Sequence, residues 1–304
     1  MRLVTFDSRS SDSAAHLGCL SGDVVIDLTA AGHSVGGAAA TVCQSMDALV
    51  KSGAEGLGIA KQVVEKEGSN PKLRTGLQDV YLRAPLPYPN QIFAVGRNYR
   101  EHAEEAGAAL PTMPRLFPKW PSTVIGPGAA VIKPSRTEQL DWEVELAVVI
   151  GRDASFVSAE RALDHVFGYT ILNDVSARDI QFSKPEQLTL AKNFRTFAPL
   201  GGWILTRDEV PNPGKLSVRS WVNGALMQDS TTEYLIFDVP TLVSFISEVT
   251  DLHPGDIIST GTPSGVGCFR EPPIYLNDGD VMKMQLAQND QVLCELINQV
   301  SSAS

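Results

Sequence analysis

The sequence has no apolar run long enough to cross a membrane. Its unbroken stretches, such as Leu146–Ile150, are far shorter than the roughly 20 residues that a membrane helix needs. The first residues, Met1–Asp7, lack the apolar segment of a secretory signal, so we expect none. The formal net charge is −10 and no basic block interrupts the chain, which argues against nucleic acid or an anionic membrane as partner. Small-molecule chemistry and protein binding remain.

Cysteine is also sparse and carries no recognisable motif. The four cysteines, Cys19, Cys43, Cys268 and Cys294, form neither a C-x-x-C pair nor a zinc-ribbon spacing. We therefore expect reduced thiols and a cytoplasmic location. The composition is otherwise that of a folded globular protein, with 43% hydrophobic and 20% charged residues in 304 positions.

Proline marks a division of the chain near residue 85. Pro85, Pro87 and Pro89 fall within five residues, a density that ends regular secondary structure. We therefore predict a small N-terminal α/β module over residues 1–85 and a larger domain over residues 86–304. In the module, alternation and periodicity predict strands at Leu3–Asp7, His16–Leu20 and Val24–Leu28 and a helix over about Gln44–Lys66.

The larger domain has more strand signals than helix signals. Strands are predicted at Trp142–Ile150 and Tyr169–Leu172, and Leu216–Val222 runs into Asn223-Gly224, a dipeptide favoured in hairpin turns. Later segments predict a helix entered at Asp238 and two strands near the end of the sequence, Val281–Leu286 and Val292–Ile297. Many strands, hairpin turns and few helices predict a mixed, mainly antiparallel α+β fold.

Glu143 and Glu145 are the most informative pair of residues. On a strand, residues two apart point to the same face, so their carboxylates form half of a site for a hard cation. A half-exposed strand with a polar outer face is the alternative. The apolar run Leu146–Ile150 that follows favours a strand buried on both faces, where carboxylates are rare unless paired or metal-bound.

Asp174 offers a third carboxylate, where an apolar strand ends and a short polar helix is expected. If that helix begins at Asp174, Arg178 and Gln181 lie on its face. An N-cap aspartate with an arginine partner is the alternative. Three carboxylates without His or Cys beside them favour Mg²⁺, Mn²⁺ or Ca²⁺ over zinc.

His102 and Glu105 are three residues apart in a predicted helix over Asn98–Ala106, so Glu105 can hold the imidazole in one tautomer. A histidine oriented in this way is the usual base that activates water, although a surface histidine among carboxylates has the same sequence pattern. Lys192 is a lone cation among apolar neighbours; buried, it would stabilise an oxyanion, and exposed, it would only reach solvent.

A glycine-rich loop follows the strand around Ile257. The segment His253–Gly267 can cradle a carboxylate with backbone N–H groups or form a structural turn, and it fits no nucleotide-binding motif.

Together these segments resemble the fumarylacetoacetate hydrolase family over about residues 90–300. The resemblance rests on five segments in the family's order: Gly96–Glu105, Asp141–Gly151, Asn173–Gln181, Thr189–Lys192 and His253–Gly267. It implies a mixed β-roll of the fumarylacetoacetate hydrolase type, a homodimer and bound Mg²⁺ or Mn²⁺. Arg195 and Ser264 depart from the family's pattern, and the first predicts an altered preference for substrate charge.

The resemblance also implies a role for each site residue. Glu143, Glu145 and Asp174 would hold the metal, while His102 with Glu105 would activate water. Lys192 would stabilise and protonate an enolate, Arg178 and Gln181 would bind the substrate's carboxylate or oxo end, and Gly261 and Thr262 would line the same pocket. Side chains of Thr112–Trp120 and Ser183–Gln187 are expected to select the substrate's distal group.

The expected function is a metal-dependent hydrolase that cleaves a C–C bond in a 1,3-diketo acid of the acylpyruvate or fumarylpyruvate type. On the same metal site, a β-keto acid decarboxylase acting on oxaloacetate or an isomerase of a 2-hydroxy-diene-dioate is the alternative. A ligand-binding relative without catalysis is an alternative of another class.

Overall fold

A computed structural model describes residues 1–8 and 15–303. Within these residues the larger sheet has eleven strands and a second sheet has five. The larger sheet runs in the order β4-β3-β2-β1-β15-β12-β11-β18-β6-β7, with β5 paired to β1, and the second in the order β17-β16-β19-β20-β9. Both sheets are mixed, because β6 pairs parallel with β18 and β9 parallel with β20. The predicted α+β class is confirmed.

The strands of the larger sheet are β1 (Arg2–Ser8), β2 (His16–Ser21), β3 (Val24–Asp27), β4 (Arg74–Gly76), β5 (Val80–Leu82), β6 (Ile92–Gly96), β7 (Arg115–Lys119), β11 (Val144–Ile150), β12 (Val166–Asn173), β15 (Ile204–Thr206) and β18 (Ile257–Ser259). Those of the second sheet are β9 (Val131–Lys133), β16 (Ser217–Val222), β17 (Ala225–Thr231), β19 (Val281–Gln288) and β20 (Gln291–Ser302). Two short pairs complete the strands: β10 (Leu140–Asp141) with β13 (Ser176–Ala177), and β8 (Val124–Ile125) with β14 (Ala198–Pro199).

The helices are α1 (Leu28–Val35), α2 (Ala38–Val42), α3 (Met46–Lys51), α4 (Gly53–Glu67), α5 (Arg100–Glu105), α6 (Ala159–Ala162), α7 (Arg178–Gln181), α8 (Leu188–Ala191) and α9 (Val239–Val249). Short 3₁₀ turns are η1 (Pro71–Leu73), η2 (Leu77–Asp79), η3 (Pro121–Thr123), η4 (Leu163–His165), η5 (Arg207–Glu209), η6 (Thr232–Tyr234) and η7 (Gly267–Phe269). No helix in the described ranges is long and apolar enough to span a membrane.

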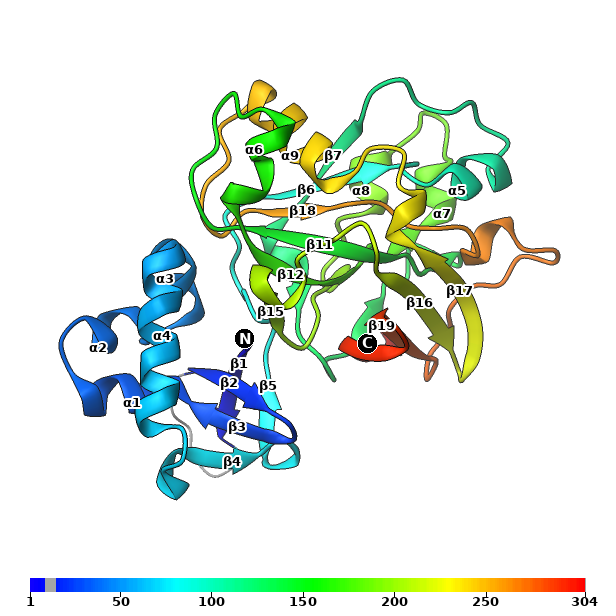
Figure 1. Cartoon of the computed structure of the whole chain (residues 1–304). Coiled ribbons are helices and arrows are strands. Elements are labelled where there is room, and N and C mark those ends of the chain that lie inside the picture. Colours follow the sequence, from blue (N-terminus) through cyan, green and yellow to red (C-terminus); the bar gives the residue numbers. More distant parts are fainter. Residues whose placement is uncertain (9–14, 304) are drawn as a thin grey trace.

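The N-terminal residues form a projection that remains joined to the rest of the molecule (Figure 1). Helices α1–α4 and strands β1–β5 gather there, but β1 pairs with β15, so one sheet runs through both parts. The hydrophobic core also crosses residue 85, because Leu49 and Val50 share a buried cluster with Val149 and Ile257. The proline-rich segment therefore separates two parts that share a sheet and a core.

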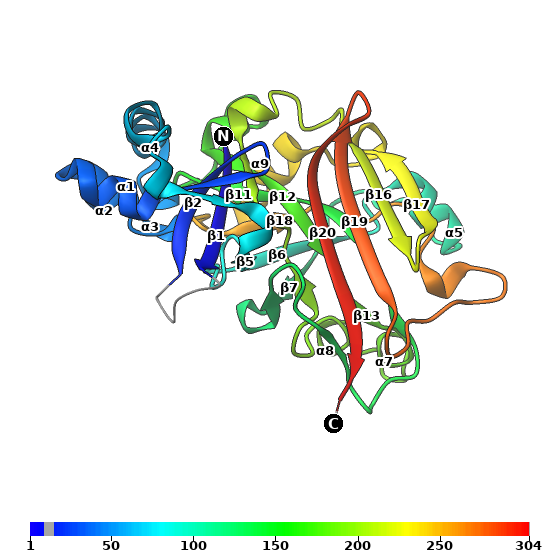
Figure 2. The same cartoon turned by 90° about the horizontal axis from the view of Figure 1, so that it is seen from below.

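Strand β11 is buried on both faces, as the run Leu146–Ile150 predicts. Leu146, Val148 and Ile150 pack into one core cluster, whereas Ala147 and Val149 pack into the other. The first cluster lies against the second sheet, whose strands β16, β17, β19 and β20 lie side by side in Figure 2. Because it is buried on both faces, β11 is a rigid support for the side chains at its start.

Several predicted boundaries are wrong in informative ways. The helix expected over Gln44–Lys66 breaks into α3 and α4, because Gly53 adopts a left-handed φ of 55°. The strand expected over Val24–Leu28 ends at Asp27, whose side chain caps α1 by accepting from the Ala30 N–H. The hairpin at Asn223-Gly224 and the helix capped by Asp238 form as predicted.

Candidate active site

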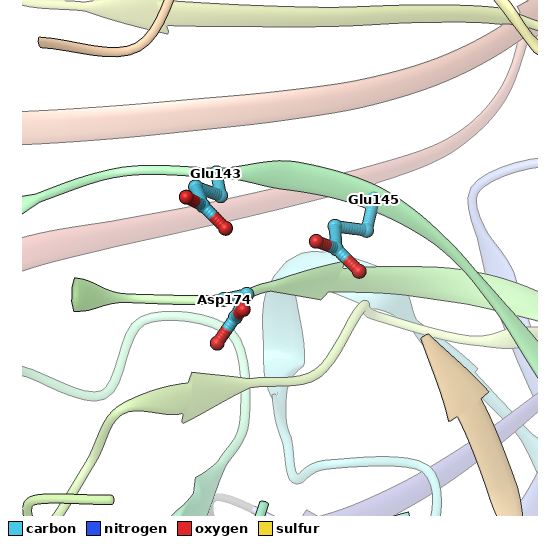
Figure 3. Close-up of side chains that lie close together, drawn as sticks. All are labelled: Glu143, Glu145 and Asp174. Carbon is cyan, nitrogen blue, oxygen red and sulfur yellow. The ribbon is translucent and has the colours of Figure 1, made fainter. Parts of the chain in front are cut away.

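Three carboxylates converge where β11 and β12 meet. Glu143 directly precedes β11, Glu145 lies within it, and Asp174 directly follows β12. The antiparallel register pairs Val144 with Asn173, and the Asp174 N–H donates to the Glu143 carbonyl at 2.9 Å. Glu143, Glu145 and Asp174 each offer an oxygen within 4.8 Å of the others, and Figure 3 shows the side chains turned toward one another.

These carboxylates are buried, and two of them are paired with buried cations. The Lys192 Nζ lies 2.7 Å from Glu143 Oε2 and 2.6 Å from Asp174 Oδ2. Arg178 Nη2 donates to Glu143 Oε1 at 2.7 Å, and Lys119 Nζ donates to Asp174 Oδ1 at 2.6 Å. Although burial opposes ionisation, Lys192 and Arg178 lower the pKa of Glu143 to about 2. Asp174 and Glu143 in turn raise the pKa of Lys192 against the effect of burial.

Glu145 is the exception, because no cation in the described part of the chain forms an ion pair with it. Its Oε2 accepts from the Ser259 hydroxyl at 2.5 Å and from the Gly261 N–H at 2.9 Å. Burial, then the charges of Asp174 and Glu143, raise its pKa well above the ordinary value. A divalent cation among the three carboxylates would supply the positive charge that Glu145 lacks. The donor set, oxygen alone, suits Mg²⁺, Mn²⁺ or Ca²⁺.

His102 and Glu105 form the predicted pair on α5. His102 Nδ1 lies 2.7 Å from Glu105 Oε1, and the Gly265 N–H donates to Glu105 Oε2 at 2.9 Å. Because an ionised carboxylate can only accept, Nδ1 carries the proton and Nε2 is left as the basic nitrogen. The helix is shorter than predicted and begins at Arg100, since Tyr99 is still extended.

A single cleft brings these groups together. His102, the three carboxylates and Lys192 all line it, as do Arg178, Gln181 and Thr262. Its remaining wall is largely apolar and includes Phe117, Phe182, Leu188 and Phe269. The His102 and Phe269 rings lie 6.0 Å apart, centre to centre. The cleft thus joins a charged floor to an apolar wall, a combination typical of small-molecule sites.

Arg178 lies in the cleft, and each of its three guanidinium nitrogens donates to a side chain of the protein. Its Nε donates to Asp141 at 2.8 Å and its Nη1 to Gln181 at 2.8 Å, in addition to the bond to Glu143. The helix predicted from Asp174 begins only at Arg178, because Ser176 and Ala177 pair with β10 as strand β13. Arg178 therefore holds Glu143 in place, and its direct contact with a substrate stays a prediction.

The glycine-rich loop contributes through its backbone. Gly261 has a φ of 99°, and a Cβ there would lie 2.8 Å from the Asn98 Cβ, so only glycine fits. Its N–H is bonded to Glu145, and a substrate contact by Gly261 stays a prediction. Thr262 lines the cleft and donates to the Val144 carbonyl at 3.0 Å.

Two residues of the site, Lys119 and Asp141, were not predicted from the sequence. Lys119 is 1% exposed, on the edge strand β7, and also donates to the Lys192 carbonyl at 2.6 Å. In the sequence, Lys119 has apolar neighbours as Lys192 does, and this pattern could have indicated a buried lysine. Asp141 accepts from the Gly267 and Cys268 N–H groups, so it ties the end of β10 to η7. Its proximity to Glu143 gave no signal of that role.

The two segments expected to select the substrate lie beside the cleft. Arg115 and Phe117 from Thr112–Trp120 line it, and Phe182 and Leu188 flank Ser183–Gln187. Arg195 is exposed and is not among the residues that line the cleft, so the structure gives it no direct contact there.

The chain is similar to known proteins over most of its length. Residues 91–301 match the family model described as Fumarylacetoacetate (FAA) hydrolase C-terminal. The chain is 38% identical to "Oxaloacetate tautomerase fahd2, mitochondrial" of Xenopus laevis, over 94% of this chain and 87% of that protein.

Two solved structures are similar over the whole of both chains. One is maleylpyruvate hydrolase from Sphingobium sp. SYK-6 in complex with manganese(II) ion and pyruvate, at 33% identity and a TM-score of 0.78. The other is a probable 2-hydroxyhepta-2,4-diene-1,7-dioate isomerase from Mycobacterium abscessus, at 28% identity and a TM-score of 0.77. The family model spans well over half of the chain, and the relatives have the same architecture throughout. The chain belongs to the fumarylacetoacetate hydrolase family.

Proposed function

We propose that this protein is a divalent-metal-dependent hydrolase that cleaves a C–C bond in a 1,3-diketo acid of the acylpyruvate or fumarylpyruvate type. The observation that carries the proposal is one cleft lined by His102, held by Glu105, and by three buried carboxylates and Lys192. The similarity to a maleylpyruvate hydrolase that binds manganese and pyruvate supports it.

Glu143, Glu145 and Asp174 would hold the cation, Mg²⁺ or Mn²⁺. When bound, it would supply Lewis-acid polarisation of the substrate's 2-oxo group and offset negative charge that develops on that oxygen.

The remaining steps follow from the side chains. His102 Nε2 takes a proton from water, and the hydroxide adds to the distal carbonyl carbon. As that adduct collapses, the C–C bond breaks and its electron pair passes to C3 of the pyruvate portion. The Lys192 ammonium, held between Glu143 and Asp174, stabilises the enolate oxygen and returns a proton to C3. The distal fragment leaves as a carboxylic acid that carries the oxygen and one hydrogen of the water. The other water proton, held on His102, passes through solvent to the neutral Lys192 amine, so that both side chains are restored and one water is consumed.

A second candidate is proton transfer on oxaloacetate, either tautomerisation or decarboxylation. The 38% identity to an oxaloacetate tautomerase favours it. Stabilisation of an enolate by the same charged residues of the cleft is sufficient for decarboxylation. Isomerisation of a 2-hydroxy-diene-dioate uses the same enolate chemistry. We also propose that the protein forms a homodimer and is located in the cytoplasm.

The His102→Ala variant separates these candidates. We expect it to lose hydrolysis of acylpyruvates by at least 100-fold, while decarboxylation of oxaloacetate persists, and Glu143→Ala to lose both. The matched control is His33→Ala, an exposed histidine on α1. Acylpyruvate hydrolysis by His102→Ala at the wild-type rate would refute the proposed role of the histidine.

A further inference from the structure

Two arginines lie at the junction of β6 and β7 and have no role in the steps above. Arg97 directly follows β6, and Arg115 opens β7 opposite Gly96. Arg97 has a left-handed φ of 57°, a conformation that costs energy in a non-glycine residue and is concentrated at functional sites. Both arginines line the cleft that contains the three carboxylates.

Neither guanidinium forms an ion pair or hydrogen bond with residues 1–8 or 15–303. The buried cations beside the three carboxylates differ, since Lys119, Lys192 and Arg178 are all bonded to carboxylates. Two unpaired arginines in one cleft, on a chain with a net charge of −10, form a local site for an anion. An arginine fork matches a carboxylate in shape and charge.

The arginines also border an outer compartment that adjoins the cleft. Arg97, Arg115, Gln181, Phe182 and Leu188 line both it and the cleft, so the two are continuous. Gln181 Oε1 accepts from Arg178, which leaves the Gln181 amide nitrogen as a further donor. The combined space therefore has a metal-binding end, an apolar middle and a cationic outer end.

We propose that Arg97 and Arg115 bind a second carboxylate, at the distal end of the substrate. This inference rests on the proposed function, in which the 2-oxo acid end lies at Glu143, Glu145 and Asp174. It selects dicarboxylates, 2-oxo acids with another carboxylate at the far end, over acylpyruvates whose distal group is neutral. Among the described residues, Glu186 is the one carboxylate that lines the outer compartment, where it is exposed, and it would weaken the preference.

Binding of unreactive ligands tests this apart from turnover. 2-Oxoadipate and 2-oxohexanoate share the 2-oxo acid end and chain length and differ only in the distal carboxylate. Calorimetry with Mn²⁺ present would measure both on the wild type, Arg97→Gln, Arg115→Gln and Glu186→Gln. The control is Arg152→Gln, an exposed arginine just beyond the opposite end of β11.

We expect the wild type to bind 2-oxoadipate at least 10-fold more tightly than 2-oxohexanoate. Each arginine variant should lose about 10-fold in affinity for 2-oxoadipate alone. Glu186→Gln should strengthen the preference, and Arg152→Gln should leave it unchanged. Equal affinity for the two ligands in the wild type, or equal weakening of both in the arginine variants, would overturn the inference and leave the metal site standing. Failure of both ligands to bind the manganese-loaded protein would instead refute the proposed function.

Discussion

Removal of the Arg178 guanidinium should cost more stability than removal of any exposed ion pair. In Arg178→Met, Glu143 keeps Lys192, and Asp141 keeps three backbone N–H donors. Breaking a buried pair costs about 3–5 kcal/mol. Because the partners keep these other bonds, we expect about 3 kcal/mol at pH 7. The matched control, Arg219→Met, removes a partly exposed pair with Asp229 at 2.7 Å and should cost less than about 1 kcal/mol.

The stability lost in Arg178→Met should also depend on pH. The pKa of Glu143 is about 2 in the folded protein against an ordinary 4.5, a difference equivalent to about 3 kcal/mol. A lowered carboxyl pKa stabilises the fold above pH 4.5, and that stability is lost as the pH falls toward 2. Since Arg178 contributes to the lowering, the gap between the wild type and Arg178→Met should narrow below pH 4.5.

Urea unfolding with EDTA present, at pH 7 and at pH 4, measures both effects. The reasoning is refuted if Arg178→Met costs no more than Arg219→Met at pH 7, or if its deficit grows as the pH falls.

Three further predictions concern the same cluster. Glu145→Gln should raise the stability of the metal-free protein at pH 7, since it removes a buried carboxyl group whose raised pKa opposes folding above pH 4.5. The same variant should bind Mn²⁺ at least 10-fold more weakly by calorimetry, and unchanged affinity would exclude Glu145 as a ligand. Gly261→Ala should destabilise the protein by about 2 kcal/mol or more in urea, because its Cβ meets the Val95 carbonyl at 2.9 Å, and a neutral effect would contradict the close packing. Lys119→Met should lower kcat more than it raises KM, because Asp174 and the Lys192 carbonyl lose a shared donor, and wild-type kcat would contradict a positioning role.

Residues close in sequence were the predictable part of the site. Glu143 and Glu145 share a strand face, and His102 and Glu105 share a helical turn, so spacing alone predicts each pair. The buried run after Glu145 predicts the double-faced burial of β11, which the two core clusters confirm.

Contacts across the sheet could not be predicted from local pattern. Lys119 reaches Asp174 across 55 positions, and β1 meets β15 across about 200. Each depends on strand order, which spacing does not encode. Arg178 has the residue type for substrate binding, but only the folded position of Asp141 and Glu143 shows that it is bonded to both carboxylates.

Turnover of a substrate panel tests the central claim most directly. Acylpyruvates, fumarylpyruvate-type acids and oxaloacetate would be followed by absorbance with Mg²⁺ or Mn²⁺, and again after EDTA. The account predicts metal-dependent loss of the diketone band together with release of pyruvate. Turnover of oxaloacetate alone, or of no diketo acid while metal is bound, would contradict it.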